Sequence, residues 1–121
     1  AAEKISSTGN ENILLTERGT SFGYSLVSDM TSIPIMKTTG YPVVFDATHS
    51  AQLPGDKHIT EGQRNMIPVL AKSAVAAGCD GIFMEVHHDI KNAKSDASTQ
   101  WPLSKLEDLL VKLKCIYEAV N

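Results

Sequence analysis

The chain has 121 residues and a mass of 13.1 kDa, with 42% hydrophobic and 21% charged residues, which is the composition of one modest globular domain. Its formal charge of −3 provides no positive field for nucleic acid or an anionic membrane, so small-molecule chemistry is the favoured class of function. Cys79 and Cys115 form no Cys-x-x-Cys pair, which argues against a disulfide framework or a thiolate zinc site. Because apolar runs are short and the first residues lack a signal-peptide core, we expect a cytoplasmic protein.

Three short apolar runs alternate with longer helical patterns along the chain. The runs cover residues 13–15, 43–45 and 82–84, and consecutive apolar positions are typical of parallel strands covered on both faces. Helical spacing follows each run, over residues 26–36, 66–77 and 103–120, with Pro34 interrupting the first pattern. This alternation predicts a βα array within a single domain.

The connections between these predicted elements differ in length and composition. Helix-to-strand connections are short and contain glycine, at residues 39–42 and 78–81. Strand-to-helix connections are long and polar, at residues 17–24, 46–62 and 85–102. Because active sites of parallel α/β folds lie on the loops that follow the strands, we expect the functional residues on the long connections.

Arg18 follows the first predicted strand and precedes Gly19 in a loop of small and polar residues. A planar guanidinium in such a loop matches the oxygens of a carboxylate or phosphate, which predicts an anion site. The alternative is an ion pair between Arg18 and its neighbour Glu17, and the local sequence leaves both open.

His49, Glu85 and Asp96 follow the second and third predicted strands and meet at one point if those strands are neighbours. Imidazole and carboxylate groups together form a ligand set for a divalent transition metal, more than for calcium. Their spacing contains no compact signature such as His-Glu-x-x-His, so solvated loop charges are the competing interpretation.

The remaining histidines, the lysines and the absence of several known motifs limit the classes of reaction that the sequence supports. One of the adjacent His87 and His88 is a candidate ligand or proton donor and the other is structural, whereas His58 is expected to be a solvated loop residue. The sequence contains no Gly-x-Ser-x-Gly elbow, P-loop or Gly-x-Gly-x-x-Gly motif. No lysine lies at a strand end, which disfavours an unrelated Schiff-base sugar-phosphate aldolase.

Four stretches of this sequence, in order, resemble the 3-deoxy-D-manno-octulosonate 8-phosphate synthases (2-dehydro-3-deoxyphosphooctonate aldolases). They are LLTERGTSFGY (14–24), PVVFDATHSAQLPG (42–55), AVAAGCDGIFME (74–85) and KSDASTQWPL (94–103). The resemblance implies a (β/α)8 TIM barrel, usually a homotetramer, and a full barrel takes about 250 residues. Residues 1–121 then correspond to the carboxyl-terminal three βα units, a partial barrel domain without its first part.

The resemblance also implies a reaction and residue roles. The family condenses phosphoenolpyruvate with D-arabinose 5-phosphate and water, giving 3-deoxy-D-manno-octulosonate 8-phosphate and phosphate, for lipopolysaccharide or plant cell-wall carbohydrate biosynthesis. By position, Arg18 and Gln52 match substrate-binding residues, His49 and Asp96 match catalytic residues, and His49, Glu85 and Asp96 match the ligands of a divalent metal ion. The sequence of residues 95–98, Ser-Asp-Ala-Ser, resembles the metal-dependent branch of the family.

The sequence departs from the family pattern at four places, mostly in loops. Ser25 alone separates Tyr24 from Leu26, Thr31 stands where arginine is common, residues 56–59 replace a longer glycine-rich stretch, and His88 replaces a common proline. With the chain length, these departures motivate an alternative: a non-catalytic barrel-fragment module that binds an anion or a metal and needs a partner chain. Intact mass and a phosphate-release assay discriminate the two.

Overall fold

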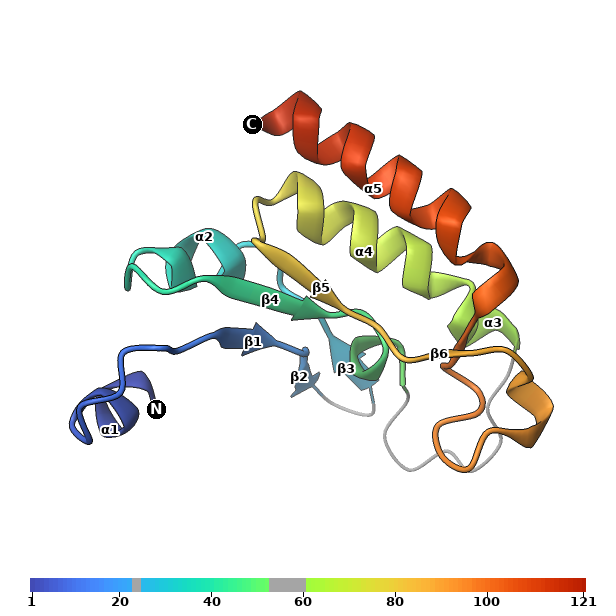
Figure 1. Cartoon of the computed structure of the whole chain (residues 1–121), viewed down its shortest axis with the longest axis horizontal. Coiled ribbons are helices and arrows are strands. Elements are labelled where there is room, and N and C mark those ends of the chain that lie inside the picture. The colour runs from blue at the N-terminus through green and yellow to red at the C-terminus, as the bar shows by residue number, and fades with distance from the viewer. Residues whose placement is uncertain (23–24, 53–60) are drawn as a thin grey trace.

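The computed structural model describes residues 1–22, 25–52 and 61–121, and a three-stranded parallel sheet forms its centre (Figure 1). The strands are β1 (Leu15–Glu17), β4 (Val43–Asp46) and β5 (Gly81–Phe83), in the order β1-β4-β5. Leu15 pairs with Val43, and Phe45 pairs with Ile82. The predicted βα array is therefore confirmed, with β4 in the middle of the sheet.

The structure also contains helices, 3-10 turns and two smaller strand pairs. The helices are α1 (Ala2–Ser6), α2 (Ser32–Lys37), α3 (Glu61–Arg64), α4 (Met66–Ala76) and α5 (Leu106–Val120), with 3-10 turns η1 (His49–Ala51), η2 (Ile90–Asn92) and η3 (Leu103–Lys105). An antiparallel hairpin joins β2 (Thr20–Phe22) to β3 (Ser25–Val27), and β6 (Val86–His87) pairs in parallel with β7 (Trp101–Pro102). None of the described helices has the length and apolar character needed to cross a membrane.

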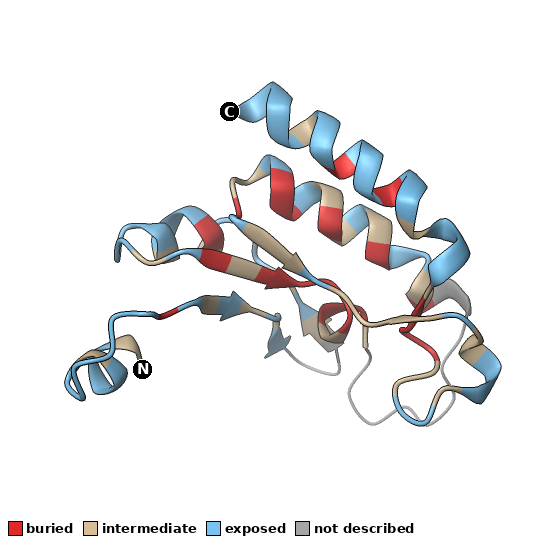
Figure 2. Cartoon of the chain, viewed as in Figure 1, coloured by how far each residue is buried: buried red, intermediate tan, exposed pale blue. Residues whose placement is uncertain are grey.

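The hydrophobic core lies between the sheet and α4, and α5 packs on α4 (Figure 2). Val43 and Phe45 alternate along β4 toward this core, and both are fully buried. On α4, Ile67, Ala71 and Ala74 recur at four and three residues and are also fully buried. The two alanines have small side chains, which lets α4 pack closely against the sheet. Truncating Phe45 to alanine would cost about 3–5 kcal/mol of stability, because the space around it is already filled.

The prolines of α2 and α4 explain how both helices tolerate a residue that usually breaks helices. Pro34 and Pro68 are each the third residue of their helix. Backbone N–H groups in the first turn have no intrahelical partner, so a proline there removes no hydrogen bond. The helix predicted at residues 66–77 is confirmed to within one residue. The helix predicted at residues 103–120 is also confirmed, with η3 as its first three residues.

The first predicted helix, residues 26–36, is wrong in its first part. Leu26 and Val27 belong to β3, which pairs with β2, and Gly19 lies between β1 and β2. Gly19 has a φ of 88°, and a Cβ atom there would lie 3.0 Å from the Leu26 side chain. The helix begins only at Ser32, after the Asp29 side chain accepts a hydrogen bond from the Thr31 backbone N–H. A local turn and a strand pairing therefore replace the first turns of the expected helix.

Neither cysteine forms a disulfide, as the sequence predicts. Cys79 is buried between α4 and β5, and Cys115 is exposed on α5. Burial and the nearby Asp80 carboxylate raise the pKa of the Cys79 thiol. The Cys79 side chain therefore acts as a small apolar core residue.

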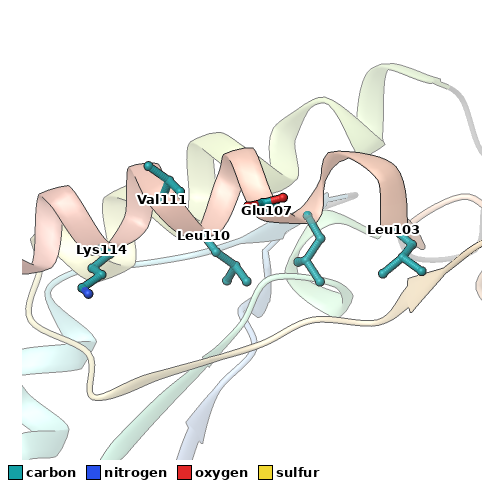
Figure 3. A pocket seen from close by; sticks show the side chains of 6 residues that line it. Leu103, Glu107, Leu110, Val111 and Lys114 are labelled. Atoms are coloured by element: carbon teal, nitrogen blue, oxygen red, sulfur yellow. The ribbon is translucent and has the colours of Figure 1, made fainter.

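A shallow hollow of about 460 Å³ lies along η3 and α5 (Figure 3). It is lined by Leu103, Leu106, Glu107, Leu110, Val111 and Lys114. None of its lining residues is a candidate site residue from the sequence, and none follows the carboxyl end of a strand in the central sheet. This hollow therefore provides no support for chemistry, and the candidate site lies elsewhere.

Candidate metal and substrate site

His49, Glu85 and Asp96 converge at the carboxyl ends of β4 and β5. One potential ligand atom from each of them lies within 4.8 Å of the other two. The Nε2 atom of His49 is 3.8 Å from Glu85 Oε1 and 3.8 Å from Asp96 Oδ2. All three side chains are partly buried, so the cluster is open to solvent on one side. The structure thus brings together the three residues that the sequence places on two different loops.

Asp46, the last residue of β4, orients the imidazole of His49. Its Oδ2 atom lies 2.8 Å from His49 Nδ1, and its Oδ1 atom accepts hydrogen bonds from the backbone N–H groups of Thr48 and His49. Because a carboxylate only accepts, the proton of the neutral imidazole stays on Nδ1, and the Nε2 lone pair faces Glu85 and Asp96. The imidazole ring also stacks on the ring of Phe83, with the two ring centroids 6.2 Å apart.

Glu85 is fixed through both its backbone and its side chain. The Glu85 backbone N–H donates to the hydroxyl of buried Thr48 at 2.7 Å, which ties β5 to the turn that contains His49. The Glu85 carbonyl accepts from the Trp101 backbone N–H at 2.9 Å, as the β6 and β7 strands begin to pair. Gln100 Nε2 then donates to Glu85 Oε2 at 2.6 Å. The second carboxylate oxygen therefore points toward His49.

Asp96 occupies a left-handed backbone conformation, with a φ of 47°. Aspartate tolerates this conformation better than most residues, since its short side chain bonds locally. The Asp96 carbonyl accepts from the backbone N–H groups of Thr99 and Gln100, both at 2.9 Å. Gln52 Nε2, at the end of η1, donates to Asp96 Oδ1 at 2.6 Å. The loop is therefore closed on itself and joined to the His49 turn.

The charges of this cluster favour a divalent cation. Three carboxylates, those of Asp46, Glu85 and Asp96, surround one imidazole. Within residues 1–22, 25–52 and 61–121, no lysine or arginine lies within ion-pair distance of any of them. Nitrogen and oxygen donors with a surplus of negative charge form a ligand set typical of Mn²⁺, Fe²⁺, Co²⁺ or Zn²⁺. The residues present therefore fit a transition-metal ion.

Arg18 lies just beyond the end of β1, and its side chain is exposed. The alternative prediction of an ion pair with Glu17 is wrong. The Glu17 carboxylate instead accepts from the Gly19 backbone N–H and from the Ser32 hydroxyl, both at 2.8 Å. Because β1 and β4 are parallel neighbours, Arg18 and His49 both follow the carboxyl ends of strands at the same end of the sheet. The guanidinium is therefore available to an anion at this end.

The other histidines lie outside the three-residue group. The rings of His87 and His88 stack at 4.7 Å, and His87 Nδ1 accepts from the Asp89 backbone N–H at 2.8 Å. Neither belongs to the His49 cluster, so the structure gives no support to either as its fourth ligand. His58 lies outside the described residues.

Sequence reasoning missed the residues that support the cluster. Asp46 had a usable signal, because an aspartate three residues before a histidine at a strand end suits a side-chain-capped turn. Gln100 and Arg64 had no local signal, since their contacts join distant parts of the chain. The structure alone identifies them.

A parallel βα array with ionisable side chains at the carboxyl edge of its sheet is the architecture of part of a (β/α)8 barrel. The whole chain, residues 1–121, matches the DAHP synthetase I family, and it belongs to that family.

Several curated relatives are similar over nearly the whole chain. A 2-dehydro-3-deoxyphosphooctonate aldolase of Geobacter sp. (strain M21) is 58% identical over 120 residues, which cover 98% of this chain and 44% of the relative. A protein of the same name from Acidithiobacillus ferrooxidans (strain ATCC 53993 / BNL-5-31) is 55% identical over 122 residues, which cover 99% of this chain and 43% of that relative. A third protein of this name, from Legionella pneumophila (strain Lens), is 55% identical over 117 residues, which cover 95% of this chain and 43% of that relative. The chain therefore spans less than half the length of these relatives.

A solved structure supports the fold assignment. The crystal structure of phospho-2-dehydro-3-deoxyheptonate aldolase (DAHP synthase) from Thermotoga maritima superposes with a TM-score of 0.81 and 28% sequence identity. The superposition covers 98% of this chain and 33% of the Thermotoga chain. The expected fold, three βα units of a TIM barrel, is thereby confirmed.

Proposed function

We propose that the protein that carries this chain condenses phosphoenolpyruvate with D-arabinose 5-phosphate and water, and releases inorganic phosphate. The observation that supports this most strongly is 52–58% identity to several relatives named 2-dehydro-3-deoxyphosphooctonate aldolase. The name describes an eight-carbon acid. Three of those carbons come from phosphoenolpyruvate, which leaves a five-carbon aldose phosphate as the second substrate.

Arg18 is proposed to bind an oxyanion of phosphoenolpyruvate. Its exposed guanidinium makes no ion pair within the described residues and lies at the sheet edge that also contains His49. A planar fork of donors binds carboxylate or phosphate oxygens in two-pronged fashion, which fixes orientation as well as position. Gln52 is proposed to line the same site, and its amide nitrogen also contacts Asp96.

His49, Glu85 and Asp96 are proposed to hold a divalent metal ion. When bound, such an ion supplies Lewis acidity and fixes the orientation of an oxygen substrate. The chain itself prepares the three donors: Asp46 keeps the proton of His49 on Nδ1, Gln100 orients Glu85, and Gln52 orients Asp96. His49 and Asp96 are also proposed as catalytic residues, because their positions match catalytic residues in the family resemblance.

Three further properties come with this proposal from the family resemblance. They are a cytoplasmic location, a homotetrameric assembly and a place in lipopolysaccharide or cell-wall carbohydrate biosynthesis. The mixed composition is compatible with small anionic substrates, and its net charge of −3 provides no overall positive field for nucleic acid.

The test is a product assay with aldose phosphates of different length. The purified protein, supplied with Mn²⁺ or Co²⁺, is incubated with phosphoenolpyruvate and either arabinose 5-phosphate or a four-carbon aldose phosphate. Mass spectrometry then identifies the acid that forms. We expect the eight-carbon acid phosphate from arabinose 5-phosphate and at most a small yield of the seven-carbon product.

Two outcomes would contradict the proposal. Preferential formation of a seven-carbon acid would assign the protein to the heptonate branch, to which the Thermotoga structure belongs. Absence of any product, with phosphoenolpyruvate and metal both shown to bind, would instead support the non-catalytic module.

A further inference from the structure

Arg64, the last residue of α3, contacts the loop that contains Asp96. Its Nε atom donates to the carbonyl of Gln100 at 3.0 Å, and one terminal nitrogen donates to the carbonyl of Ala97 at 2.6 Å. We call residues 95–100 the Asp96 loop. A single, partly buried guanidinium thus bonds to the carbonyl of the residue after Asp96 and to the carbonyl of Gln100, the last residue of the loop.

The Asp96 loop determines the position of two of the three proposed metal ligands. Asp96 itself belongs to the loop and has a left-handed backbone, with a φ of 47°. Gln100, at the other end, directs its Nε2 toward Glu85 Oε2 at 2.6 Å and is 7% exposed. Any change in the path of this loop therefore moves the carboxylate of Asp96 and releases that of Glu85.

We propose that Arg64 is a positioning residue, which holds the Asp96 loop in the conformation that brings Asp96 and Glu85 to His49. The inference rests on the proposed function of this cluster. A left-handed backbone is unfavourable for a residue with a side chain, so Asp96 keeps it only where surrounding contacts enforce it. Two hydrogen bonds from one charged donor are strong enough to enforce it, since each is charge-assisted and the planar group fixes both directions.

Lysine is a poor substitute for arginine in this arrangement. An ammonium group is a compact donor on a flexible stem and does not present two donors in a fixed fork. Arg64→Lys therefore keeps the charge and loses the paired geometry, whereas Arg64→Met removes both. Lys72→Met on α4 is the matched control, because it removes one positive charge from the helix after α3, and among the described residues Lys72 forms no hydrogen bond or ion pair with the Asp96 loop.

Two measurements on the purified protein test the proposal. Hydrogen exchange reports on the backbone amides of Thr99 and Gln100, which donate to the Asp96 carbonyl and need no metal for their protection. A Co²⁺ titration, followed by visible absorption, reports on the ligand cluster. We expect Arg64→Met to exchange these amides at least tenfold faster and to weaken Co²⁺ binding about tenfold, the lower range for outer partners of metal ligands.

The variants separate the possible results. Arg64→Lys should give intermediate values, and Lys72→Met should match wild type in both measurements. Unchanged amide exchange in Arg64→Met overturns the proposal, as does faster exchange with unchanged Co²⁺ affinity. If Arg64→Met does not fold, the same two readouts on Arg64→Lys decide. If wild type binds no Co²⁺, the proposed metal centre fails, and amide exchange alone decides whether Arg64 holds the loop.

Discussion

At the scale of single residues, the candidate site depends on which atoms donate hydrogen bonds and which accept them. The Asp46 carboxylate accepts from His49 Nδ1 at 2.8 Å and from two backbone N–H groups, and it is only 7% exposed. This one side chain therefore shapes the turn after β4 and also decides which imidazole nitrogen is free. The free nitrogen, Nε2, is the one that faces Glu85 and Asp96.

Asp46→Asn tests that arrangement with almost no change in volume. If its amide oxygen keeps the backbone hydrogen bonds, its NH₂ group faces His49 Nδ1 and moves the imidazole proton to Nε2. We expect Co²⁺ affinity to fall about 10- to 100-fold, the usual effect of losing an outer partner of a metal ligand. A Co²⁺ titration measures this, with Asp29→Asn, in a similar side-chain-capped turn, as the control. Wild-type affinity in Asp46→Asn would contradict the account.

Arg18→Ala tests the anion site separately from the metal cluster. A charge-assisted hydrogen bond contributes about 1.5–3 kcal/mol, so we expect kcat/KM for phosphoenolpyruvate to fall about 10- to 100-fold. Co²⁺ binding should not change, because within the described residues Arg18 forms no hydrogen bond or ion pair with any of the three cluster residues. Steady-state kinetics with varied phosphoenolpyruvate measure the effect, with exposed Lys105→Ala as the control. An unchanged kcat/KM would place the anion site elsewhere.

At the scale of elements, Asp80 joins three parts of the fold at the opposite edge of the sheet. It precedes β5, accepts from the Val43 backbone N–H at the start of β4, and pairs with Lys37 of α2 at 3.0 Å. The Val43 hydrogen bond and the Lys37 ammonium lower the pKa of the Asp80 carboxyl. The connections between helices and strands are therefore closed by one carboxylate, well away from the loops that contain the site.

Asp80→Asn should reduce stability in a pH-dependent way. Because the folded pKa is lower than the unfolded one, the ionised carboxylate stabilises the fold above the unfolded value of about 3.9, and this is lost as pH falls through the folded pKa. With the side chain 39% exposed, solvent screening limits the effect to about 1 kcal/mol or less. Urea unfolding at pH 7 and pH 3 measures it, with exposed Asp108→Asn as control. An equal deficit for Asp80→Asn at both pH values would contradict this explanation.

The elements also show what could be predicted from sequence. The strands containing Val43 and Ile82 were predictable because their apolar positions are consecutive and flanked by glycine connections. The β2–β3 hairpin was not, because Leu26 and Val27 followed by Met30 and Ile33 also fit helical spacing, and only pairing with residues 20–22 decides. In the same way, the residues of the His49 cluster could be named, whereas the contact between Arg64 and the Asp96 loop becomes visible only when α3 and that loop are packed together.

At the scale of the whole molecule, the described chain has one closed face and several open ones. α4 and α5 cover one side of the sheet, while β1 and β5 each pair with β4 only (Figure 1). Large apolar side chains remain exposed, among them Leu14 at 65%, Phe83 at 45% and Val111 at 57%. In a closed barrel every strand has two neighbours. These open faces agree with a chain that spans less than half the length of its curated relatives.

We propose that condensation depends on the cluster formed by His49, Glu85 and Asp96. The most direct test is the rate of phosphate release from phosphoenolpyruvate and arabinose 5-phosphate in Mn²⁺ or Co²⁺, compared among wild type, His49→Ala and His88→Ala. His88 is the matched control, because it is exposed and lies outside the cluster. We predict release that requires both substrates, is retained in His88→Ala and is nearly abolished in folded His49→Ala. Undiminished release in His49→Ala would contradict the account.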